Sequence, residues 1–135
     1  MIIQINIDFN SDEALYIQLC NEIIRGIALE QIHEGDALPS VRQLADVIGI
    51  NMHTVNKAYT VLKQEGFIKL DRRRGAVISL DVDKYQAIQE LRENLNVVLT
   101  RALCKNVTRE ETHQLVDEIF DRYAPGTGRE RQQLD

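Results

Sequence analysis

The sequence predicts a mainly α-helical protein with a small β-hairpin, namely a winged helix-turn-helix followed by a short two-helix dimerisation segment. Three observations support this fold class. Two short amphipathic segments flank Gly49, as in two helices joined by a tight turn. Two β-type segments then surround the run 72–75, as in a hairpin. Beyond residue 83, apolar residues recur at helical spacing, which is typical of packed helices. The expected divisions are 1–80, 81–124 and a disordered tail, 125–135.

The first short helix carries both a start signal and a stop signal. Ser40 is a good N-cap, and Gln43 three residues later completes a capping box. Gly49 ends the helix, because glycine enters the left-handed conformation without steric cost. The residues expected on its apolar side are Leu44, Ala45, Val47 and Ile48.

The second helix has one apolar face and one polar face. It is expected to start after Asn51, which can cap it, and to end at Gly66. The apolar residues repeat at i, i+3, i+4 and i+7, and they are Val55, Ala58, Tyr59 and Leu62. The opposite face carries His53, Asn56, Lys57 and Thr60. The second helix of a helix-turn-helix can enter the DNA major groove, so this polar face is a candidate base-reading surface, with Lys57 placed for a phosphate.

The hairpin is expected to form from strands 67–71 and 76–80, with a strongly basic turn between them. A hairpin that follows a helix-turn-helix forms a wing, and arginines in its turn suit phosphates or a minor groove. The turn residues are Arg72, Arg73, Arg74 and Gly75.

The residues LPSVRQLA, the helix start with Asn51, Thr54 and Val55, and the run KAYTVLKQEGFI with an arginine–glycine turn resemble the GntR family of bacterial transcription regulators. The short region after the wing resembles its YtrA-type subfamily. The resemblance covers roughly residues 13–80, and it implies a DNA-binding regulator, commonly a repressor. It assigns DNA contact to these positions: Arg42, Met52, His53, Thr54, Asn56, Arg72, Arg73, Arg74 and Gly75.

The sequence departs from the family at two places. Met52 and His53 stand where the family often has arginine, serine or proline and asparagine, which concerns the base preference. Gly75 is followed by Ala76 and Val77, whereas the family usually has a second glycine and a threonine, which concerns the wing tip.

Positive charge is concentrated in the predicted helix-turn-helix and wing turn, residues 38–75. The whole chain has a net charge of −5. Residues 38–75 nevertheless hold seven bases against three acids, whereas residues 1–37 hold one base against seven acids. Such an asymmetry is the electrostatic footprint that a DNA-binding surface requires. A run of charge on its own is usually a solvated face, so this observation supports the motif and does not replace it.

Residues 3–9 alternate apolar and polar side chains, which predicts a half-buried strand. Its partner would be the wing hairpin or a second protomer, or the segment is an ordinary N-terminal edge strand. A helix capped by Asn10 or Ser11 is expected to follow, running to about Gln31 and closing a three-helix core. Cys20 lies in its apolar stripe and is expected to be a core residue.

The last two helices are expected to hold a homodimer. In the first of them the apolar spacing alternates between three and four, the pattern of a coiled-coil seam. Thr108 with Glu111 forms a capping box that opens the second. The predicted dimerisation residues are Ile88, Leu91, Leu95, Val98, Leu99, Ala102, Ile119 and Phe120. The alternative is a monomer in which these two helices pack against the winged helix-turn-helix of the same chain.

The sequence carries little sign of other chemistry. The three histidines and two cysteines show no zinc-like spacing, and the glycines at 126–128 do not follow a strand, so neither a metal, a cofactor nor an enzyme is expected. No apolar run is long enough to span a membrane, and two distant cysteines fit a reducing cytoplasm. The partners expected are double-stranded operator DNA and a second copy of the chain. Two rivals remain: a winged-helix module that binds proteins, and a regulator controlled by a small ligand at the dimer seam.

Overall fold

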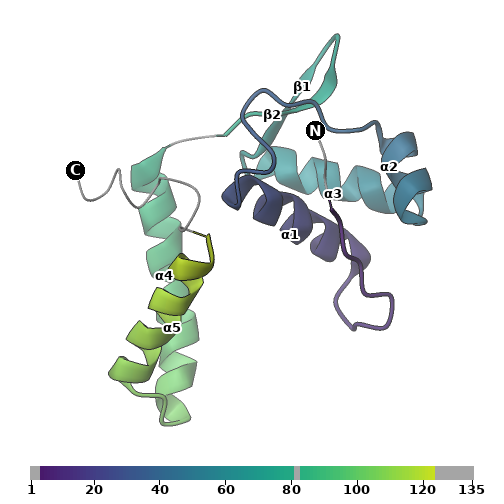
Figure 1. Cartoon of the computed structure of the whole chain (residues 1–135). Coiled ribbons are helices and arrows are strands. Elements are labelled where there is room, and N and C mark those ends of the chain that lie inside the picture. Colours follow the sequence, from purple (N-terminus) through teal and green to yellow (C-terminus); the bar gives the residue numbers. More distant parts are fainter. Residues whose placement is uncertain (1–3, 81–82, 124–135) are drawn as a thin grey trace. The chain divides into compact units, whose positions relative to one another are not determined.

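The computed structural model describes residues 4–80 and 83–123, and the chain divides into two compact units, Met1–Asp81 and Val82–Asp135. The elements are α1 (Leu15–Ala28), α2 (Val41–Ile48), α3 (Met52–Gln64), β1 (Ile68–Asp71), β2 (Gly75–Ile78), α4 (Lys84–Cys104) and α5 (Arg109–Tyr123) (Figure 1). The predicted fold class, a winged helix-turn-helix followed by two helices, is therefore confirmed. The predicted tail, 125–135, lies outside the described residues.

The local signals around α2 and α3 are confirmed in detail. The Ser40 hydroxyl accepts a hydrogen bond from the Gln43 backbone N–H at 3.1 Å, and the Gln43 side chain accepts one from the Ser40 N–H at 3.0 Å. Gly49 ends α2 in the left-handed conformation, with φ of 81°. The Asn51 side chain then caps α3 by accepting from the N–H of His53 at 2.7 Å. These caps position the turn between the two helices.

One residue of α2 was predicted on the wrong side. Val47 is 83% exposed, whereas Leu44 and Ala45 are buried and Ile48 is half-buried. The covered stripe of this eight-residue helix passes through Leu44, Ala45 and Ile48. Val47 lies about 100° around the helix from the middle of that stripe, which leaves it facing solvent.

The wing is an antiparallel hairpin whose strands pair from Ile68 opposite Ile78 to Asp71 opposite Gly75. Both strands are shorter than predicted. The N–H of Phe67 bonds the carbonyl of Leu62 at 2.9 Å, behind the end of α3, and only the carbonyl of Phe67 faces the hairpin, where it accepts from the N–H of Ser79 at 3.0 Å. At the other end, the N–H of Leu80 bonds the Glu34 carboxylate at 2.9 Å and not a strand partner.

The segment before α2 lines the outer edge of β2 and anchors the wing to the core. The N–H of Gly35 bonds the carbonyl of Ile78, the N–H of Ile78 bonds the carbonyl of Asp36, and the N–H of Leu38 bonds the carbonyl of Ala76, each at 2.8 Å. Ala37 forms an isolated bridge with Val77. The wing base is thereby held between its own hairpin partner and this connecting segment.

α1 and α3 form the centre of the core of the first unit. The most deeply buried side chains are Leu19, Ile23, Ile32, Val55, Leu62, Val77 and Ile78. Ile32 folds back on α1 at Gly26, where a Cβ would lie 2.7 Å from the Ile32 Cδ1 atom and would displace that buried side chain. Cys20 is buried as predicted, and its thiol donates to the carbonyl of Ala58 at 3.4 Å. This hydrogen bond joins α1 to α3.

The start of α1 and the segment before it differ from the prediction. The helix begins at Leu15 without a side-chain cap. The Ser11 hydroxyl bonds the N–H of Glu13 within a turn, so it does not cap the helix. Residues 4–8 form no strand, and at the end of this segment the backbone N–H and carbonyl of Asp8 bond the buried side chain of Gln18, at 2.8 and 3.0 Å.

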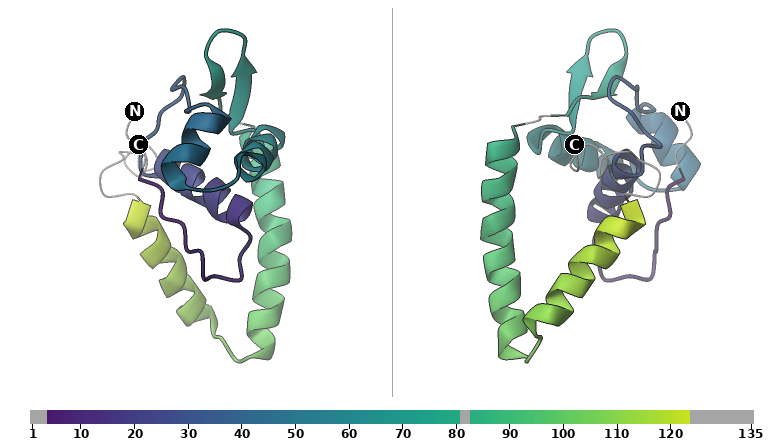
Figure 2. Two further views of the ribbon diagram at one scale, coloured as in Figure 1. Left: turned by 90° about the vertical axis from the view of Figure 1, so that its right-hand side faces the viewer. Right: turned by 60° about the vertical axis from the view of Figure 1, so that its left-hand side comes forward.

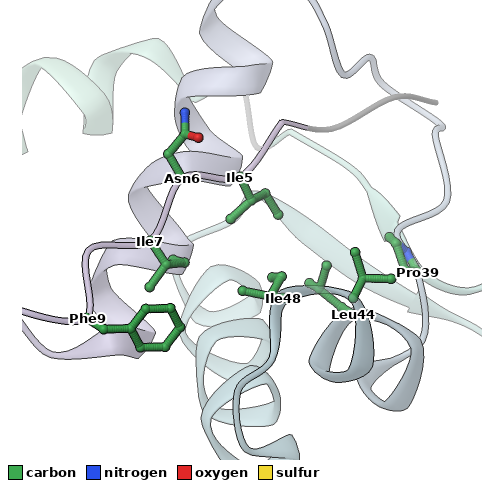
Figure 3. Close-up of a pocket in the computed structure, with 8 residues that line it drawn as sticks. Ile5, Asn6, Ile7, Phe9, Pro39, Leu44 and Ile48 are labelled. Carbon is green, nitrogen blue, oxygen red and sulfur yellow. The ribbon is translucent and has the colours of Figure 1, made fainter.

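The alternation in this N-terminal arm, residues 4–8, still orders its side chains. Ile5 and Ile7 are half-buried and pack against the core, whereas the polar residues between them are exposed. Together with Phe9 they face α2 across an open hollow of about 580 Å³, shown in Figure 3, which is also lined by Asn6, Pro39, Leu44, Val47 and Ile48. The period of two therefore predicted the inward face correctly at Ile5 and Ile7, whereas Phe9 is 60% exposed and no ladder partner lies beside the arm among the described residues.

The second unit consists of α4 and α5, which diverge from the turn that joins them (Figure 2). The predicted capping box at α5 is confirmed: the Thr108 hydroxyl accepts from the N–H of Glu111 at 3.1 Å, and the Glu111 carboxylate accepts from the N–H of Thr108 at 2.9 Å. Neither helix has a buried residue. A helix both long and apolar enough to cross a membrane is absent from the described residues.

Candidate nucleic-acid interface

α3 presents its polar face to solvent because its apolar face is fixed in the core. Val55, Ala58, Tyr59 and Leu62 are buried, as predicted. The Tyr59 hydroxyl donates to the carbonyl of Pro39 at 2.7 Å, which ties the middle of α3 to the residue before the α2 cap. Burial raises the pKa of that hydroxyl far above its usual range, so it remains a donor. The exposed side chains on the other face are His53, Asn56, Lys57 and Thr60.

The residues of this face do not offer equal hydrogen-bonding capacity. The Thr60 hydroxyl donates to the carbonyl of Asn56 at 2.9 Å and is therefore engaged with its own helix. Within the described ranges, the Asn56 side-chain amide makes no hydrogen bond, so its donor and acceptor both face outward. Met52 is 43% exposed at the start of the helix, and Thr54 is half-buried. The chemistry suited to base edges is thus concentrated in the first turns of α3.

Lys57 does not extend freely from α3. Its Nζ atom lies over the ring of Tyr16, 4.1 Å from the ring centroid. Tyr16 belongs to the first turns of α1, and the two residues line one shallow hollow with Leu15, His53 and Thr54. No sequence pattern indicates this contact, because residues 16 and 57 are distant in the chain.

The three arginines of the wing turn also differ from one another. Arg74 donates to the carbonyl of Gly35 at 3.0 Å, and its guanidinium lies 3.6 Å from the Asp71 carboxylate. In the described parts of the chain no ion pair or hydrogen bond engages the guanidinium groups of Arg72 and Arg73. Arg72 and Arg73 therefore remain available to a ligand, whereas Arg74 holds the wing against the segment before α2.

Asp71 determines the shape of the turn. Its carboxylate accepts hydrogen bonds from the backbone N–H groups of Arg73 and Arg74, at 2.8 and 3.1 Å. These two bonds, more than the nearby Arg74 charge, hold the pKa of Asp71 below its usual value. Gly75 closes the turn with φ of 75°, a conformation in which a Cβ would be strained. The predicted wing tip is therefore a defined turn built on Asp71, a residue that no sequence motif placed in the site.

Arg42 lies on the exposed side of α2, and in the described residues no carboxylate pairs with it. The predicted contact residues thus come from three places on one unit: Arg42 from α2, the first turns of α3, and the wing turn. No group of three His, Cys, Asp or Glu side chains in the described residues could hold a metal ion.

The predicted dimerisation residues lie on the second unit and are poorly covered within the described chain. Leu99 and Ala102 are half-buried. The others are exposed, by 40% for Leu95 and by 58% for Phe120. Tyr85 and Val97, which the spacing rule did not select, are also exposed apolar side chains on α4. Within the second unit, α4 and α5 do not cover this apolar surface themselves.

A polar recognition-helix face beside a basic hairpin, on a three-helix core, defines a winged helix-turn-helix protein. Residues 15–78 match the family described as bacterial regulatory proteins, gntR family. Over 119 residues the chain is 34% identical to the HTH-type transcriptional repressor YtrA of Bacillus subtilis. The matched region covers 85% of this chain and 91% of that protein.

Two solved structures have the same architecture. The transcriptional antiterminator from Listeria monocytogenes EGD-e superposes with a TM-score of 0.80 at 28% identity, covering 91% of this chain and 94% of that one. YtrA from Sulfolobus acidocaldarius, a GntR-family transcription factor, gives a TM-score of 0.64 at 41% identity, covering 74% and 97%. The chain belongs to the GntR family and is a DNA-binding transcription regulator, not an enzyme.

Proposed function

We propose that this regulator binds a palindromic operator as a homodimer and represses transcription from it, in the cytoplasm. The observation that carries the proposal is the exposed face of α3, on which the Asn56 amide is unengaged within the described residues, beside the unpaired arginines of the wing. The similarity to a protein named as a repressor supports the direction of regulation.

Each contact residue has a role that follows from its chemistry. Asn56 can bond the N6 and N7 atoms of an adenine, and Met52 can offer only apolar contact, for example to a thymine methyl group. Lys57 and Arg42 are assigned to phosphates, as are Arg72 and Arg73. Arg74 is assigned to wing geometry, because Gly35 and Asp71 already engage its guanidinium.

The second unit supports the proposed homodimer. α4 and α5 carry apolar side chains on surfaces that the second unit by itself does not bury. Monomeric proteins rarely leave large contiguous apolar patches in water, and such patches mark sites of association. A two-fold dimer presents the same patch on both subunits, and its symmetry would be matched by two operator half-sites about one helical turn apart.

The test is a selection of bound fragments from a pool of random duplex DNA, followed by titration of the recovered sequence. The expected result is an inverted repeat, bound by two chains. Recovery of a single asymmetric site bound by one chain would refute the dimer. If no sequence is enriched over the pool, sequence-specific binding is refuted, and a purely protein-binding role for the winged helix would have to be considered in its place.

A further inference from the structure

The aromatic ring beneath Lys57 is the feature of this surface that the proposed contacts do not use. The Lys57 ammonium lies 4.1 Å from the centroid of the Tyr16 ring, well within the roughly 6 Å over which a cation is attracted to an aromatic face. Tyr16 is half-buried, and it packs against the core of the first unit. The ring is therefore a fixed platform, and the flexible lysine is the part that it restrains.

The partner of Lys57 matters because a ring and a carboxylate have opposite consequences for DNA binding. The ion pairs of the described residues join Arg25 to Glu22, His33 to Asp36 and Arg74 to Asp71, and none includes Lys57. A carboxylate would neutralise the ammonium and compete with a phosphate for it. A ring face restrains the ammonium but leaves its charge and its N–H donors available.

The two tyrosines of the helical core show that this arrangement is specific to Tyr16. Tyr59 uses its hydroxyl, which donates to the carbonyl of Pro39. The Tyr16 hydroxyl has no hydrogen-bond partner in the described residues, and its ring face carries the contact. The hollow that Tyr16 lines also includes His53 and Thr54, so the platform lies beside the base-reading end of α3.

We propose that Tyr16 is a positioning residue for DNA binding: its ring holds the Lys57 ammonium in place for a phosphate while α3 occupies the major groove. This inference rests on the proposed phosphate role of Lys57. A free lysine loses considerable side-chain freedom when it docks, and a lysine already restrained by a ring loses less. By this inference α1, otherwise a core helix, also contributes to the interface.

The experiment is a double-mutant cycle on the full chain, titrated with the selected duplex at several salt concentrations. The variants are Tyr16→Leu, Tyr16→Phe, Lys57→Ala and the double variant Tyr16→Leu with Lys57→Ala. Tyr16→Leu should weaken binding about threefold per half-site, or about tenfold for a dimer. Tyr16→Phe, which keeps the ring and removes the hydroxyl, should bind like the unmodified chain. In the Lys57→Ala background, Tyr16→Leu should have no further effect.

The salt dependence separates positioning from folding. Lys57→Ala should lower the slope of log K against log salt by about 0.9 per half-site, and Tyr16→Leu should lower it part of the way. A simple loss of folded protein would leave the slope unchanged, and circular dichroism provides the independent check of folding.

Three outcomes would overturn the inference. Equal losses from Tyr16→Leu with and without Lys57 would mean that Tyr16 acts by itself, and a loss from Tyr16→Phe as large as that from Tyr16→Leu would assign the effect to the hydroxyl. An unaltered affinity in Lys57→Ala would remove the phosphate role of Lys57, and the inference with it. The operator proposal would survive all three, because it fails only if the selection yields no inverted repeat.

Discussion

The two units of this chain bury their apolar side chains to very different extents. In the first unit, Leu19, Ile23 and Leu62 have no exposed surface. In the second, no residue of α4 or α5 is buried, and Leu91 is 56% exposed. Both units have clear amphipathic patterns and capped helices. A pattern therefore identifies the face that must be covered, but it does not say whether the cover comes from the same chain or another.

Removing the second unit should have the largest effect on dimerisation and on operator affinity. A chain ending at residue 82 should keep the helical content of the first unit, because its core is complete without α4 and α5. It should be monomeric and bind the operator 10²–10⁴-fold more weakly, roughly, because the two half-sites would no longer be linked. Analytical ultracentrifugation and a binding titration measure both effects, and a truncated chain that still dimerises would contradict the assignment of the second unit.

A point substitution tests the same assignment without shortening the chain. Leu95→Asp should dissociate the dimer, because it would place an unpaired charge in the apolar seam. The matched control is Asn96→Asp, which adds the same charge to an adjacent exposed position of α4. Dissociation by both variants would mean that charge on α4, and not its position in the seam, is responsible.

The stability of the two units should also depend differently on protein concentration. Leu62→Ala removes a fully buried side chain and should lower the free energy of unfolding by about 2–5 kcal/mol. That loss should be the same at every concentration. The effect of Leu91→Ala should depend on protein concentration, because only association covers this side chain. Urea unfolding of both variants at two protein concentrations that differ about a hundredfold distinguishes the two effects. If the losses of stability in both variants respond in the same way to protein concentration, the proposed difference between the units is refuted.

Within the first unit, base reading should be separable from phosphate contact. Asn56→Ala should cost about 1–3 kcal/mol of discrimination at one symmetric pair of operator positions. Lys57→Ala, one residue away, should weaken binding to all sequences evenly and serves as the control. The measurement is the affinity for every single-base variant of the operator. An unchanged ranking in Asn56→Ala would remove direct readout by this residue.

The wing arginines should divide into two classes. Replacing Arg72 and Arg73 together with alanine should weaken binding to all sequences and reduce the salt slope by about 0.9 for each phosphate that is no longer neutralised. Arg74→Ala should leave this slope closer to that of the unmodified chain, because Gly35 and Asp71 engage its guanidinium. A slope that falls most in Arg74→Ala would reverse the assignment.

The smallest effect concerns the two cysteines, one in each unit. Burial, and to a lesser extent the charge of Glu65, raises the pKa of Cys20 from 9.0 to about 11. Because this pKa is raised on folding, the thiol contributes stability that is fully present below pH 9 and is lost as the pH rises through about 11. Relative to Cys20→Ala, the unmodified chain should lose stability in that window. At neutral pH a maleimide should label exposed Cys104 first, and equal labelling of Cys20 would contradict its burial.

Sequence reasoning succeeded where the signal was local. The caps at Ser40, Asn51 and Thr108 depend on residues within three positions of one another, and each is confirmed. It failed at the N-terminal arm, where the predicted strand is absent from residues 4–8. There the Asp8 backbone bonds the side chain of Gln18, ten residues away, a contact that the alternating pattern does not indicate.

The same limit applies to the candidate site. The polar face of α3 was predictable from helical periodicity, and its exposure is confirmed residue by residue at His53 and Asn56. The contacts of Lys57 with Tyr16 and of Arg74 with Gly35 join positions 41 and 39 residues apart, so no spacing rule could have found them. Whether these residues touch DNA, and whether α4 and α5 pair between chains, remain predictions.

The hydrogen bond from Tyr59 to Pro39 has a consequence for how operators can be distinguished. It fastens the middle of α3 to the residue that precedes the α2 cap, at 2.7 Å, while the capping box holds the start of α2. The two helices are therefore expected to move together, so that a tilt of α3 would carry α2 with it. If α3 reads the operator as proposed, a new base preference is expected to arise by exchanging side chains on an unchanged helix axis. In evolutionary terms, operator choice would then change by substitution, in steps as small as one residue.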